Sequence, residues 1–501
     1  MPSELATVVL AAGKGTRLKS DHAKVLHHAA GLPLVAHVLR AVAPLRSAKA
    51  AAPAWVVVGH QADLVRYIVE GFGARTVLQR PQLGTGHAVA QALRVLPRSV
   101  RRILVLPGDA PLIRTDTLRA LLGLHRQGGY AATILSARLE DPAGYGRIVR
   151  SESGSVEGIV EQKLLQPDQS GLREVNSGMY CFERETLAAF LGRLGRDNPH
   201  REYYLTDVIA LIRGQGGAVG ACLAPDPDEI LGVNTRAELA RVDALLSRRK
   251  AEALMAAGVT LYQPETLAID PDVAIAVDTV IERGVELRGA TRIGRRCRIG
   301  AFSILENAVI GDDVIIRAHT LVYNSRVAAG ASVGPFAHLR DAADVRQRAR
   351  IGNYVEVKKS VVGEGTKAQH LTYLGDATVG RDTNVGAGTI TCNYDGVNKN
   401  PTAIGDRVFI GSGTELVAPV RVGSGGYIAA GSTVTENVPR DALAIARSRQ
   451  LNKPGWARTR RQKLAAAKAR KEEPPMGVQL SNARQRPAKR AKKPALRKRR
   501  K

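Results

Sequence analysis

Two short segments of the 501-residue chain carry side chains suited to chemistry on phosphates and amines. Near the N-terminus, an apolar run ends in Gly13-Lys14-Gly15-Thr16-Arg17, and Lys24 follows. Glycines after a strand let backbone N–H groups approach phosphate oxygens, and the lysines and arginine could offset triphosphate charge. In the C-terminal half, His370 could serve as a base near neutral pH, because an unperturbed histidine has a pKa of about 6.5.

Each segment, taken alone, also fits a structural role. The glycine segment is not a Walker motif and lacks the third glycine of the dinucleotide fingerprint, so it could be a plain βα turn. A lone histidine is more often structural than catalytic. His370 nevertheless lies in 369–376, a segment that interrupts a regular repeat, and a loop that leaves a solenoid is where function is expected. The residues alone leave both interpretations open.

The elements around the glycine segment alternate between short apolar runs and longer helical patterns. Expected strands lie at 7–12, 54–59 and 103–106, and expected helices at 33–43, 62–69 and 116–125. This alternation predicts a Rossmann-like α/β domain at 1–234, with a mostly parallel sheet covered on both faces. A polar, helix-prone stretch at 235–257 is expected to be a helical linker.

The chain around His370 has a different period. Aliphatic residues recur at every sixth position, as in Ile275, Ile281, Leu287, Ile293, Ile299 and Leu305, with slips of one residue further along. A six-residue repeat predicts a parallel β-helix over 258–457, in which each hexapeptide supplies a strand and a turn and the aliphatic side chain points inward. A β-sandwich would instead show a period of two.

The charge of the chain is unevenly distributed. Lys and Arg outnumber Asp and Glu by 73 to 46, which gives a net charge of +27. Residues 458–501 are basic and proline-containing, with few apolar side chains, so we expect a disordered tail that could contact polyanions. Only 4% of residues are aromatic, which disfavours nucleic-acid binding by base stacking.

The expected compartment is the cytoplasm. The chain starts without a signal-peptide pattern, and it contains no run of 18 or more apolar residues. The four cysteines fit neither a C-x-x-C motif nor a disulfide-dense pattern, so we interpret them as reduced thiols: Cys181, Cys222, Cys297 and Cys392.

Several strings of the N-terminal half resemble the signature segments of sugar-nucleotide pyrophosphorylases. They are Leu10-Ala11-Ala12-Gly13-Lys14-Gly15-Thr16-Arg17, Lys24-Val25-Leu26-His27, Gln82-Leu83-Gly84-Thr85-Gly86-His87, Gly108-Asp109, Gly144-Tyr145-Gly146-Arg147, Asn176-Ser177-Gly178 and Gly232-Val233-Asn234. Together with the hexapeptide domain, residues 5–456 are similar to the bifunctional bacterial members of that family, which make UDP-N-acetylglucosamine. The chain departs from the family pattern at Ala23, Pro107 and Asp341-Ala342.

The resemblance implies a uridylyltransferase site in the α/β domain. UTP and N-acetylglucosamine 1-phosphate would react there, with Mg²⁺ held by Asp109 and Asn234; oxygen ligands of this kind suit Mg²⁺. On Asp109 alone, a helix cap is the other interpretation. The full implied binding set is Leu10, Ala11, Ala12, Gly13, Arg17, Lys24, Gln79, Gly84, Thr85, Gly108, Asp109, Gly146, Glu161, Asn176 and Asn234.

The resemblance also implies an acetyltransferase site on a left-handed β-helix. His370 would remove a proton from the amine of glucosamine 1-phosphate while that amine attacks acetyl-CoA, and Glu356 would orient the imidazole. Arg340 and Lys358 would bind the sugar phosphate, and the sugar would be held by Tyr373, Asn384, Asn393 and Tyr394. Acetyl-CoA would lie along Ala387, Ser412, Ala430 and Arg447. Arg340 could instead be a solvated arginine on a turn.

The resemblance further implies a homotrimer. Two alternatives remain at this point. The chain could be a single-activity pyrophosphorylase whose β-helix is only a scaffold, or a polyanion-binding protein that acts through its basic tail.

Overall fold

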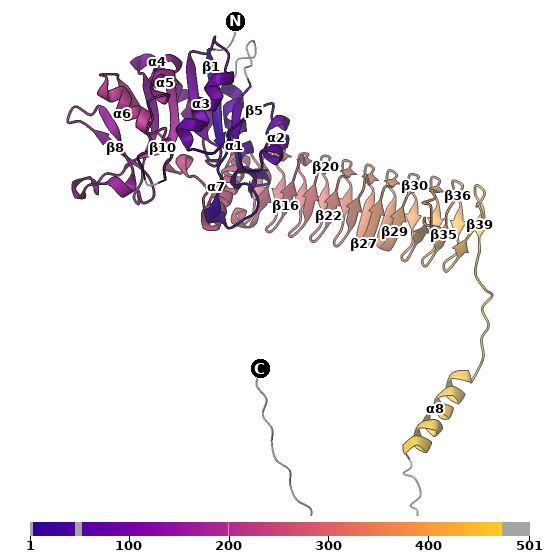
Figure 1. Cartoon of the computed structure of the whole chain (residues 1–501). Coiled ribbons are helices and arrows are strands. Elements are labelled where there is room, and N and C mark those ends of the chain that lie inside the picture. Colours follow the sequence, from indigo (N-terminus) through magenta and orange to yellow (C-terminus); the bar gives the residue numbers. More distant parts are fainter. Residues whose placement is uncertain (1–3, 46–52, 199, 473–501) are drawn as a thin grey trace, which may run out of the picture. The chain divides into compact units, whose positions relative to one another are not determined.

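The computed structural model describes residues 4–45, 53–198 and 200–472. The chain divides into two compact units, Met1–Ala446 and Arg447–Lys501. In the first unit an α/β domain is followed by helix α7 (Arg236–Ala256) and a long β-helix (Figure 1). Within the described residues, no helix combines the length and apolar character that a membrane span requires.

The α/β domain is built on a nine-stranded sheet with the central order β11-β7-β10-β6-β1-β4-β5. Strands β6, β1, β4 and β5 are parallel neighbours, as the βαβ pattern predicts, whereas β10 runs antiparallel between β6 and β7. The strands are β1 (Leu5–Ala11), β4 (Trp55–Val58), β5 (Arg75–Leu78), β6 (Arg102–Pro107), β7 (Ala132–Arg138), β8 (Arg147–Arg150), β9 (Val156–Val160), β10 (Glu174–Glu183) and β11 (Val219–Leu223).

Helices cover both faces of this sheet. One face packs on α1 (Leu34–Val42), α2 (Ala62–Gly71) and α4 (Thr115–Gly128), and the other on α3 (Thr85–Val95), α5 (Arg184–Leu191) and α6 (Asp207–Gly214). Successive residues of β1 pack alternately against the two helix layers, with Val8 in one core and Val9 in the other. Because both faces are buried, the central strands β1, β4 and β6 are predominantly apolar. A small hairpin, β2 (His28–Ala29) and β3 (Leu32–Pro33), precedes α1.

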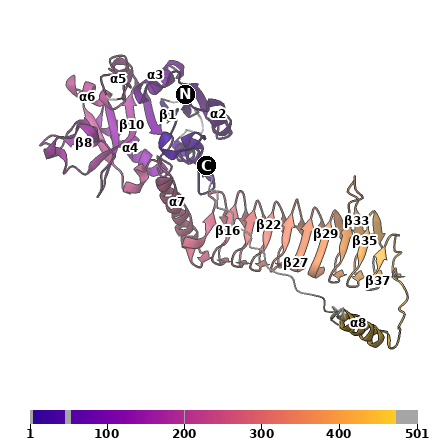
Figure 2. The ribbon, with the colours of Figure 1, turned by 60° about the horizontal axis from the view of Figure 1, so that its bottom comes forward.

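Helix α7 forms where the sequence predicts a helical linker. Its first turn is closed by a capping box between Thr235 and Glu238. Val242 packs in a small core with Leu18 and Leu112 of the α/β domain, whereas Leu254 joins the core of the β-helix. Figure 2 shows α7 leading from the α/β domain into the first coils. One helix therefore contributes to the cores of both domains.

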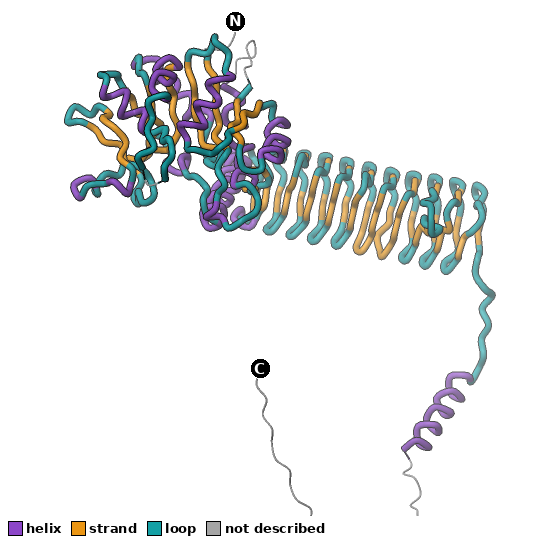
Figure 3. Tube along the Cα trace, viewed as in Figure 1, coloured by secondary structure: helices purple, strands orange, loops and turns teal. Residues whose placement is uncertain are grey.

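The C-terminal half of the first unit is the parallel β-helix expected from the hexapeptide period, left-handed as the family resemblance implies, with a short strand on each of three faces per coil (Figure 3). Face one holds β12 (Thr260–Leu261), β15 (Val280–Ile281), β18 (Arg298–Ile299), β21 (Ile315–Ile316), β24 (Ser332–Val333), β31 (Asn384–Val385), β34 (Phe409–Ile410), β37 (Tyr427–Ile428) and β39 (Leu443–Ala444). Face two holds β13 (Ala268–Ile269), β16 (Glu286–Arg288), β19 (Ile304–Glu306), β22 (Leu321–Tyr323), β25 (His338–Arg340), β32 (Ile390–Cys392), β35 (Glu415–Val417) and β38 (Thr433–Val434).

Face three is a separate nine-stranded sheet. It holds β14 (Ala274–Ile275), β17 (Arg292–Ile293), β20 (Val309–Ile310), β23 (Arg326–Val327), β26 (Asp344–Val345), β28 (Val361–Val362), β30 (Ala377–Val379), β33 (Thr402–Ile404) and β36 (Val420–Val422). Two longer strands, β27 (Arg350–Lys358) and β29 (Lys367–Gly375), turn the corner between faces one and two, because each pairs with strands of both faces.

The coil register explains the slips in the six-residue count. Ile281 pairs with Ile299, but Ile299 pairs with Ile316, so the second step is one residue shorter. Inward-pointing aliphatic side chains still stack, since Ile281, Ile299 and Ile316 are all buried. A turn can therefore be one residue shorter without disturbing the repeat, because core packing fixes the positions of the strands but not the lengths of the turns between them.

The second unit differs from the sequence prediction of disorder at 458–501. Residues 456–472 form helix α8 (Trp456–Glu472), and its side chains over 456–471 are exposed. Alanine, lysine and arginine favour helix, so local propensity rather than packing accounts for this element. The rest of the predicted tail, 473–501, lies outside the described residues.

Candidate active sites

The glycine segment after β1 allows other groups to approach its backbone closely. Gly15 has a φ of +66°, and a Cβ atom placed there would lie 2.6 Å from Cβ of Lys24. Any larger residue at position 15 would therefore be strained and would press on the lysine. Gly13, in contrast, has open space around its Cα. The turn thus brings Lys24 beside the segment and leaves the backbone at Gly13 accessible.

Lys24 is the centre of the polar cluster at the carboxyl end of the sheet. Its ammonium group forms an ion pair with Asp109 and donates a hydrogen bond of 2.9 Å to Oδ1 of Asn234. Arg17 donates to the same Asn234 oxygen, also at 2.9 Å. Both Lys24 and Asp109 keep only 16% of their side-chain surface exposed. The fold thus brings together side chains from three widely separated segments of the sequence.

The donor atoms in this cluster fit Mg²⁺. A carboxylate oxygen of Asp109 and the amide oxygen of Asn234 both face one cationic group, the ammonium of Lys24. Two hard oxygen ligands with room for water and phosphate form the kind of incomplete protein site that Mg²⁺ commonly uses. Among the described residues, no group of three or more His, Cys, Asp or Glu side chains could hold a metal by itself.

The residues expected around the nucleotide lie on the same edge of the sheet. Gly108 donates its N–H to the carbonyl of Leu10 at 2.9 Å. Gly84 is the residue before α3, and Thr85 opens that helix. The first N–H groups of a helix have no partner within the helix and suit anions, although in α3 the N–H of Gly86 already donates to the carbonyl of Tyr203 at 2.8 Å. The amide nitrogen of the buried Gln79 lies 3.0 Å from the carbonyl of Gly84 and so holds this turn in place.

The residues expected around the sugar lie at the β8–β10 end of the sheet. The backbone N–H of Asn176 donates to the carbonyl of Gly146 at 2.9 Å, which joins the two segments. The Asn176 side-chain oxygen accepts a hydrogen bond from Tyr180 at 3.0 Å. Burial, with a contribution from nearby Asp207, raises the pKa of Glu161. Glu161 is therefore a half-buried acceptor whose charge is incompletely compensated.

His370 lies at the corner between faces one and two of the β-helix. The interrupted repeat predicted a loop here, but His370 is part of β29, which pairs with β27 around the corner. The side chain is exposed, and its Nδ1 lies 3.1 Å from Oδ1 of Asn353. The interruption of the period thus reflects longer strands, not a departure from the solenoid.

The partner of the His370 ring differs from the expectation. Asn353 is the residue that pairs with His370 in the neighbouring coil, whereas Glu356 pairs with Tyr373. The Glu356 carboxylate instead accepts hydrogen bonds from Arg340, at 2.8 Å from Nε and 2.7 Å from a terminal nitrogen. Parallel register therefore assigns Asn353, not Glu356, to the histidine, because side chains of adjacent coils meet their register neighbours first.

Arg340 is held by two carboxylates. Besides Glu356, its guanidinium donates to Asp341 at 2.7 Å. Asp341 and Ala342 both adopt positive φ, at 54° and 66°, where glycine is favoured. This is the turn at which the chain departs from the family pattern, and the departure places a carboxylate on the arginine expected to bind the sugar phosphate.

A cationic group near Lys358 was missed in the sequence. The neighbouring Lys358 ammonium lowers the pKa of Lys399, although the nearby Asp376 carboxylate acts in the opposite direction, which indicates that the two ammonium groups lie close together. Asn393 donates to Asp376 at 2.6 Å and lies 3.5 Å from the hydroxyl of Tyr373. Lys399 belongs to an insertion, because Val385 pairs with Ile410 and the coil between them is longer than the other coils. This break in the six-residue repeat is the sequence signal that could have revealed Lys399.

The remaining acetyltransferase residues have a simpler arrangement. Ala387, Ser412 and Ala430 follow one another up a corner, because Gly413 donates to Ala387 at 2.7 Å and Gly431 to Ser412 at 2.8 Å. Asn384 lies on face one, where it pairs in register with Lys367 of β29. The Tyr394 hydroxyl bonds to Gly396 within its own loop. Arg447 begins the second unit.

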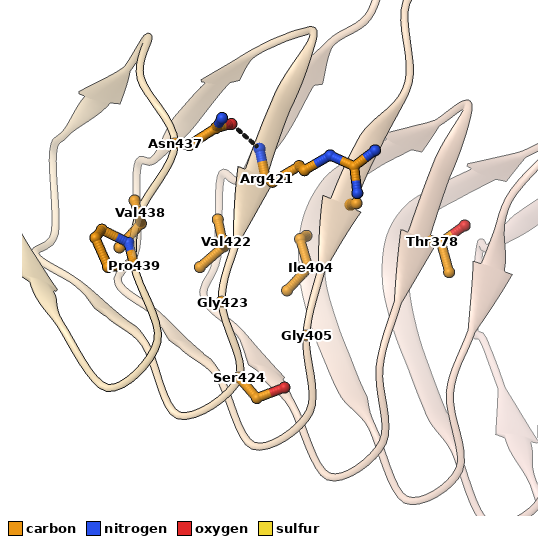
Figure 4. Close-up of a pocket in the computed structure, with 11 residues that line it drawn as sticks. Thr378, Ile404, Gly405, Arg421, Val422, Gly423, Ser424, Asn437, Val438 and Pro439 are labelled. Carbon is orange, nitrogen blue, oxygen red and sulfur yellow. Dashed lines mark hydrogen bonds between the residues drawn. The ribbon is translucent and has the colours of Figure 1, made fainter.

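A groove on face three has no expected site residue. It has a volume of about 450 Å³ and is lined by residues such as Thr378, Arg421, Ser424 and Asn437. Figure 4 shows the hydrogen bond from the backbone of Arg421 to Asn437 at its edge. The groove is therefore distinct from both candidate sites.

Comparisons with known proteins match both halves. Residues 7–257 match the MobA-like NTP transferase domain, 290–324 the bacterial transferase hexapeptide (six repeats), and 401–436 the hexapeptide repeat of succinyl-transferase. The chain is 51% identical to the bifunctional protein GlmU of Koribacter versatilis over 91% of this chain and 97% of that protein. Identity to the GlmU proteins of Pelobacter propionicus and Trichlorobacter lovleyi is 49% and 48%, over 90% and 91% of this chain and 98% of each relative.

Proposed function

The chain belongs to the family of bifunctional GlmU proteins, and we propose that its two reactions are divided between the α/β domain and the β-helix. The protein is an enzyme with nucleotidyltransferase and acetyltransferase activity. Acetyl transfer from acetyl-CoA to glucosamine 1-phosphate comes first, and uridylyl transfer from UTP to N-acetylglucosamine 1-phosphate follows. The product, UDP-N-acetylglucosamine, would serve as a cell-wall precursor, and the reactions would take place in the cytoplasm.

For uridylyl transfer, we propose that the α/β domain aligns substrates and compensates charge. A phosphate oxygen of N-acetylglucosamine 1-phosphate attacks the α-phosphorus of UTP. The bond from that phosphorus to the bridging oxygen breaks, and pyrophosphate leaves with the electron pair. Such a step needs no nucleophilic side chain, because alignment and electrostatic stabilisation supply the acceleration. The backbone at 10–13, Gly84, Thr85 and Gly108 would hold uridine and phosphates, whereas Gly146, Glu161 and Asn176 would contact the sugar.

Asp109 and Asn234 would hold Mg²⁺, which supplies charge compensation for the triphosphate. The observation that carries this assignment is the convergence of the two oxygens on the Lys24 ammonium. Lys24 and Arg17 would then bind phosphate oxygens, because each has a charged donor at this edge of the sheet.

For acetyl transfer, His370 would accept a proton from the 2-amino group of glucosamine 1-phosphate. The amine nitrogen forms a bond to the thioester carbonyl carbon, the carbon–sulfur bond breaks, and coenzyme A leaves as a thiolate that is then protonated. The proximity of His370 Nδ1 to Asn353 Oδ1 supports a ring whose Nδ1 carries the proton, so that Nε2 is the basic atom. Positive charge for the sugar phosphate comes from Arg340, Lys358 and the neighbouring Lys399.

A chelation experiment separates the two halves. Removal of divalent metal with EDTA is expected to abolish uridylyl transfer and leave acetyl transfer nearly unchanged, with pyrophosphate and free thiol as the two readouts. Excess Mg²⁺ should restore the first activity. Equal sensitivity of both reactions to EDTA would contradict the division.

Hexapeptide repeats suggest oligomerisation, and we propose a homotrimer that packs through the β-helices. A stack of rings runs along one corner, from Phe302 through His319 and Phe336 to Tyr354, with centroid separations of 5.3, 5.0 and 5.4 Å. Phe302, Phe336 and Tyr354 are 47%, 46% and 59% exposed, so this corner offers apolar surface to another copy. Sedimentation equilibrium should give three times the chain mass; a monomer would overturn the proposal.

The basic helix α8 favours an additional contact with polyanions. Its cations are exposed and include Arg458, Arg461 and Lys463. Binding that rests on counterion release falls steeply as salt rises. Deletion of 458–501 should leave both activities intact and remove any salt-sensitive binding to a single-stranded oligonucleotide. Oligonucleotide binding that survives the deletion would contradict this proposal.

A further inference from the structure

The N-terminus of α7 meets the uridylyltransferase site at Asn234. The backbone N–H of Asn234 donates to Oε2 of Glu238 at 2.7 Å, and the N–H of Thr235 donates to the same oxygen at 2.8 Å. The Thr235 hydroxyl accepts the N–H of Glu238 at 3.2 Å. One carboxylate oxygen therefore fixes two consecutive peptide groups, one of which carries the expected metal ligand.

The other side of Asn234 is anchored to the sheet. The N–H of Val233 donates to the backbone carbonyl of Asp109 at 2.9 Å, and Val233 is fully buried. Val233 packs in one core with Leu18 and with Val242 of α7. Asn234 is thus fixed between a backbone bond to Asp109 and the carboxylate of Glu238. Only its side chain projects towards Lys24.

The charge on Glu238 strengthens this arrangement. Hydrogen bonds from backbone N–H groups to a carboxylate are stronger than those to a neutral oxygen. A carboxylate in the first turn also interacts favourably with the positive end of the helix dipole. Glu238 is half-buried, and its charge contributes, after burial, to the raised pKa of Tyr145. The carboxylate is therefore part of the site's electrostatic environment and contacts the Lys24 cluster through the backbone of Asn234.

We propose that Glu238 is a positioning residue for uridylyl transfer. Its carboxylate sets the Asn234 backbone so that Oδ1 of Asn234 and the carboxylate of Asp109 converge on one cation position. This inference rests on the proposed role of Asn234 as a metal ligand. Loss of a group that orients a metal ligand typically costs about 10- to 100-fold in metal affinity.

The test compares variants of the full-length protein by Mn²⁺ binding in the presence of UTP, with free Mn²⁺ measured by electron paramagnetic resonance. Glu238→Ala is expected to weaken Mn²⁺ binding by about 10- to 100-fold. Glu238→Gln should recover much of the affinity, because glutamine also closes capping boxes. Glu252→Ala is the matched control, since Glu252 lies on the same helix and pairs with the exposed Arg248; it should bind Mn²⁺ as the wild type does.

A second variant separates positioning from helix stability. Thr235→Val removes the hydroxyl that caps Glu238 but keeps the carboxylate available to Asn234. We expect it to lower Tm at least as much as Glu238→Ala while weakening Mn²⁺ binding less. Acetyl transfer by the same chains reports whether the β-helix is intact and should stay at the wild-type rate in all four variants.

The outcomes distinguish this inference from the proposed function. If Asn234→Ala weakens Mn²⁺ binding and Glu238→Ala does not, the positioning role is overturned and the metal site stands. If Asn234→Ala binds Mn²⁺ as the wild type does, the assignment of the ligand itself fails. If Thr235→Val and Glu238→Ala weaken Mn²⁺ binding equally, α7 acts through its stability alone and the specific role of the carboxylate is wrong.

Discussion

The proposed uridylyltransferase site takes its polar side chains from strand ends and a helix start that are far apart in the chain, whereas the proposed acetyltransferase site takes its side chains from neighbouring coils. In the first site, Lys24, Asp109 and Asn234 meet because their segments end at one edge of a sheet. In the second, Asn353 meets His370 because consecutive coils align them in register. Sheet topology governs one site and repeat register the other.

Because of this difference, we expect the two sites to respond differently to amino-acid substitutions. A substitution at the Lys24 cluster disturbs a point at which several charges are mutually compensated. A substitution on the β-helix removes one member of a stacked row and leaves the coils above and below in place. We therefore expect damage in each domain to stay within that domain, so that each reaction serves as a folding control for the other.

The largest expected effect is at His370. His370→Ala should lower acetyl transfer by about 100- to 10,000-fold, because a general base is lost, while uridylyl transfer keeps its wild-type rate. Thiol release from acetyl-CoA measures the first reaction. His319→Ala, in the stack of rings on the same corner, is the matched histidine control and should retain acetyl transfer. A wild-type acetyl transfer rate in His370→Ala would remove the base assignment.

The corresponding change in the α/β domain is Asp109→Asn. It removes the carboxylate that faces Lys24 and should lower uridylyl transfer by about 100- to 1,000-fold. Pyrophosphate release measures this reaction, and acetyl transfer should be unaffected. The exposed Asp116, which pairs with Arg119 on α4, provides a control in Asp116→Asn. Equal activity of the two variants would show that the cluster does not act in uridylyl transfer.

A smaller effect tests the register argument directly. Asn353→Ala should reduce kcat of acetyl transfer about 10-fold, the size of one lost hydrogen bond of about 1.4 kcal/mol, with an altered pH profile and little change in KM. Glu356→Gln should instead change KM for glucosamine 1-phosphate, because Glu356 contacts Arg340. The reverse pattern, with the pH profile altered by Glu356→Gln only, would restore Glu356 as the residue that orients the histidine.

The smallest expected effect is at Asp341. Its carboxylate competes with substrate phosphate for Arg340, so Asp341→Asn should lower KM for glucosamine 1-phosphate about two- to fivefold, as a partly exposed pair permits. Steady-state kinetics at low ionic strength measures the change. An increase in KM would show that Asp341 supports the arginine instead of competing for it.

The repeat made most of the β-helix predictable from sequence. Inward positions such as Ile281, Ile299 and Val333 follow from the period, and all are buried. The partner of His370 was not predictable by counting sixes, because the step from Ile351 to Ala368 is one residue short. Once that shorter step is known, Asn353 aligns with His370 without further information.

Other features required knowledge of the fold. The turn at Gly15 could be read as either a βα turn or a phosphate loop, and only the approach of Lys24 to Asp109 and Asn234 shows what it positions. Glu238 had a readable signal, the T-x-x-E spacing from Thr235, but a capping box does not reveal which neighbour it holds. Helix α8 was missed because high charge suggested disorder, while its alanine-rich middle favours helix.

The most direct test of two sites on one chain is a mass-spectrometric time course. Purified protein is incubated with glucosamine 1-phosphate, acetyl-CoA, UTP and Mg²⁺. We predict that N-acetylglucosamine 1-phosphate appears first and UDP-N-acetylglucosamine then accumulates, and that EDTA stops the course at the first product. Formation of UDP-N-acetylglucosamine only when N-acetylglucosamine 1-phosphate is supplied would contradict the account, because the β-helix would then be a scaffold without activity.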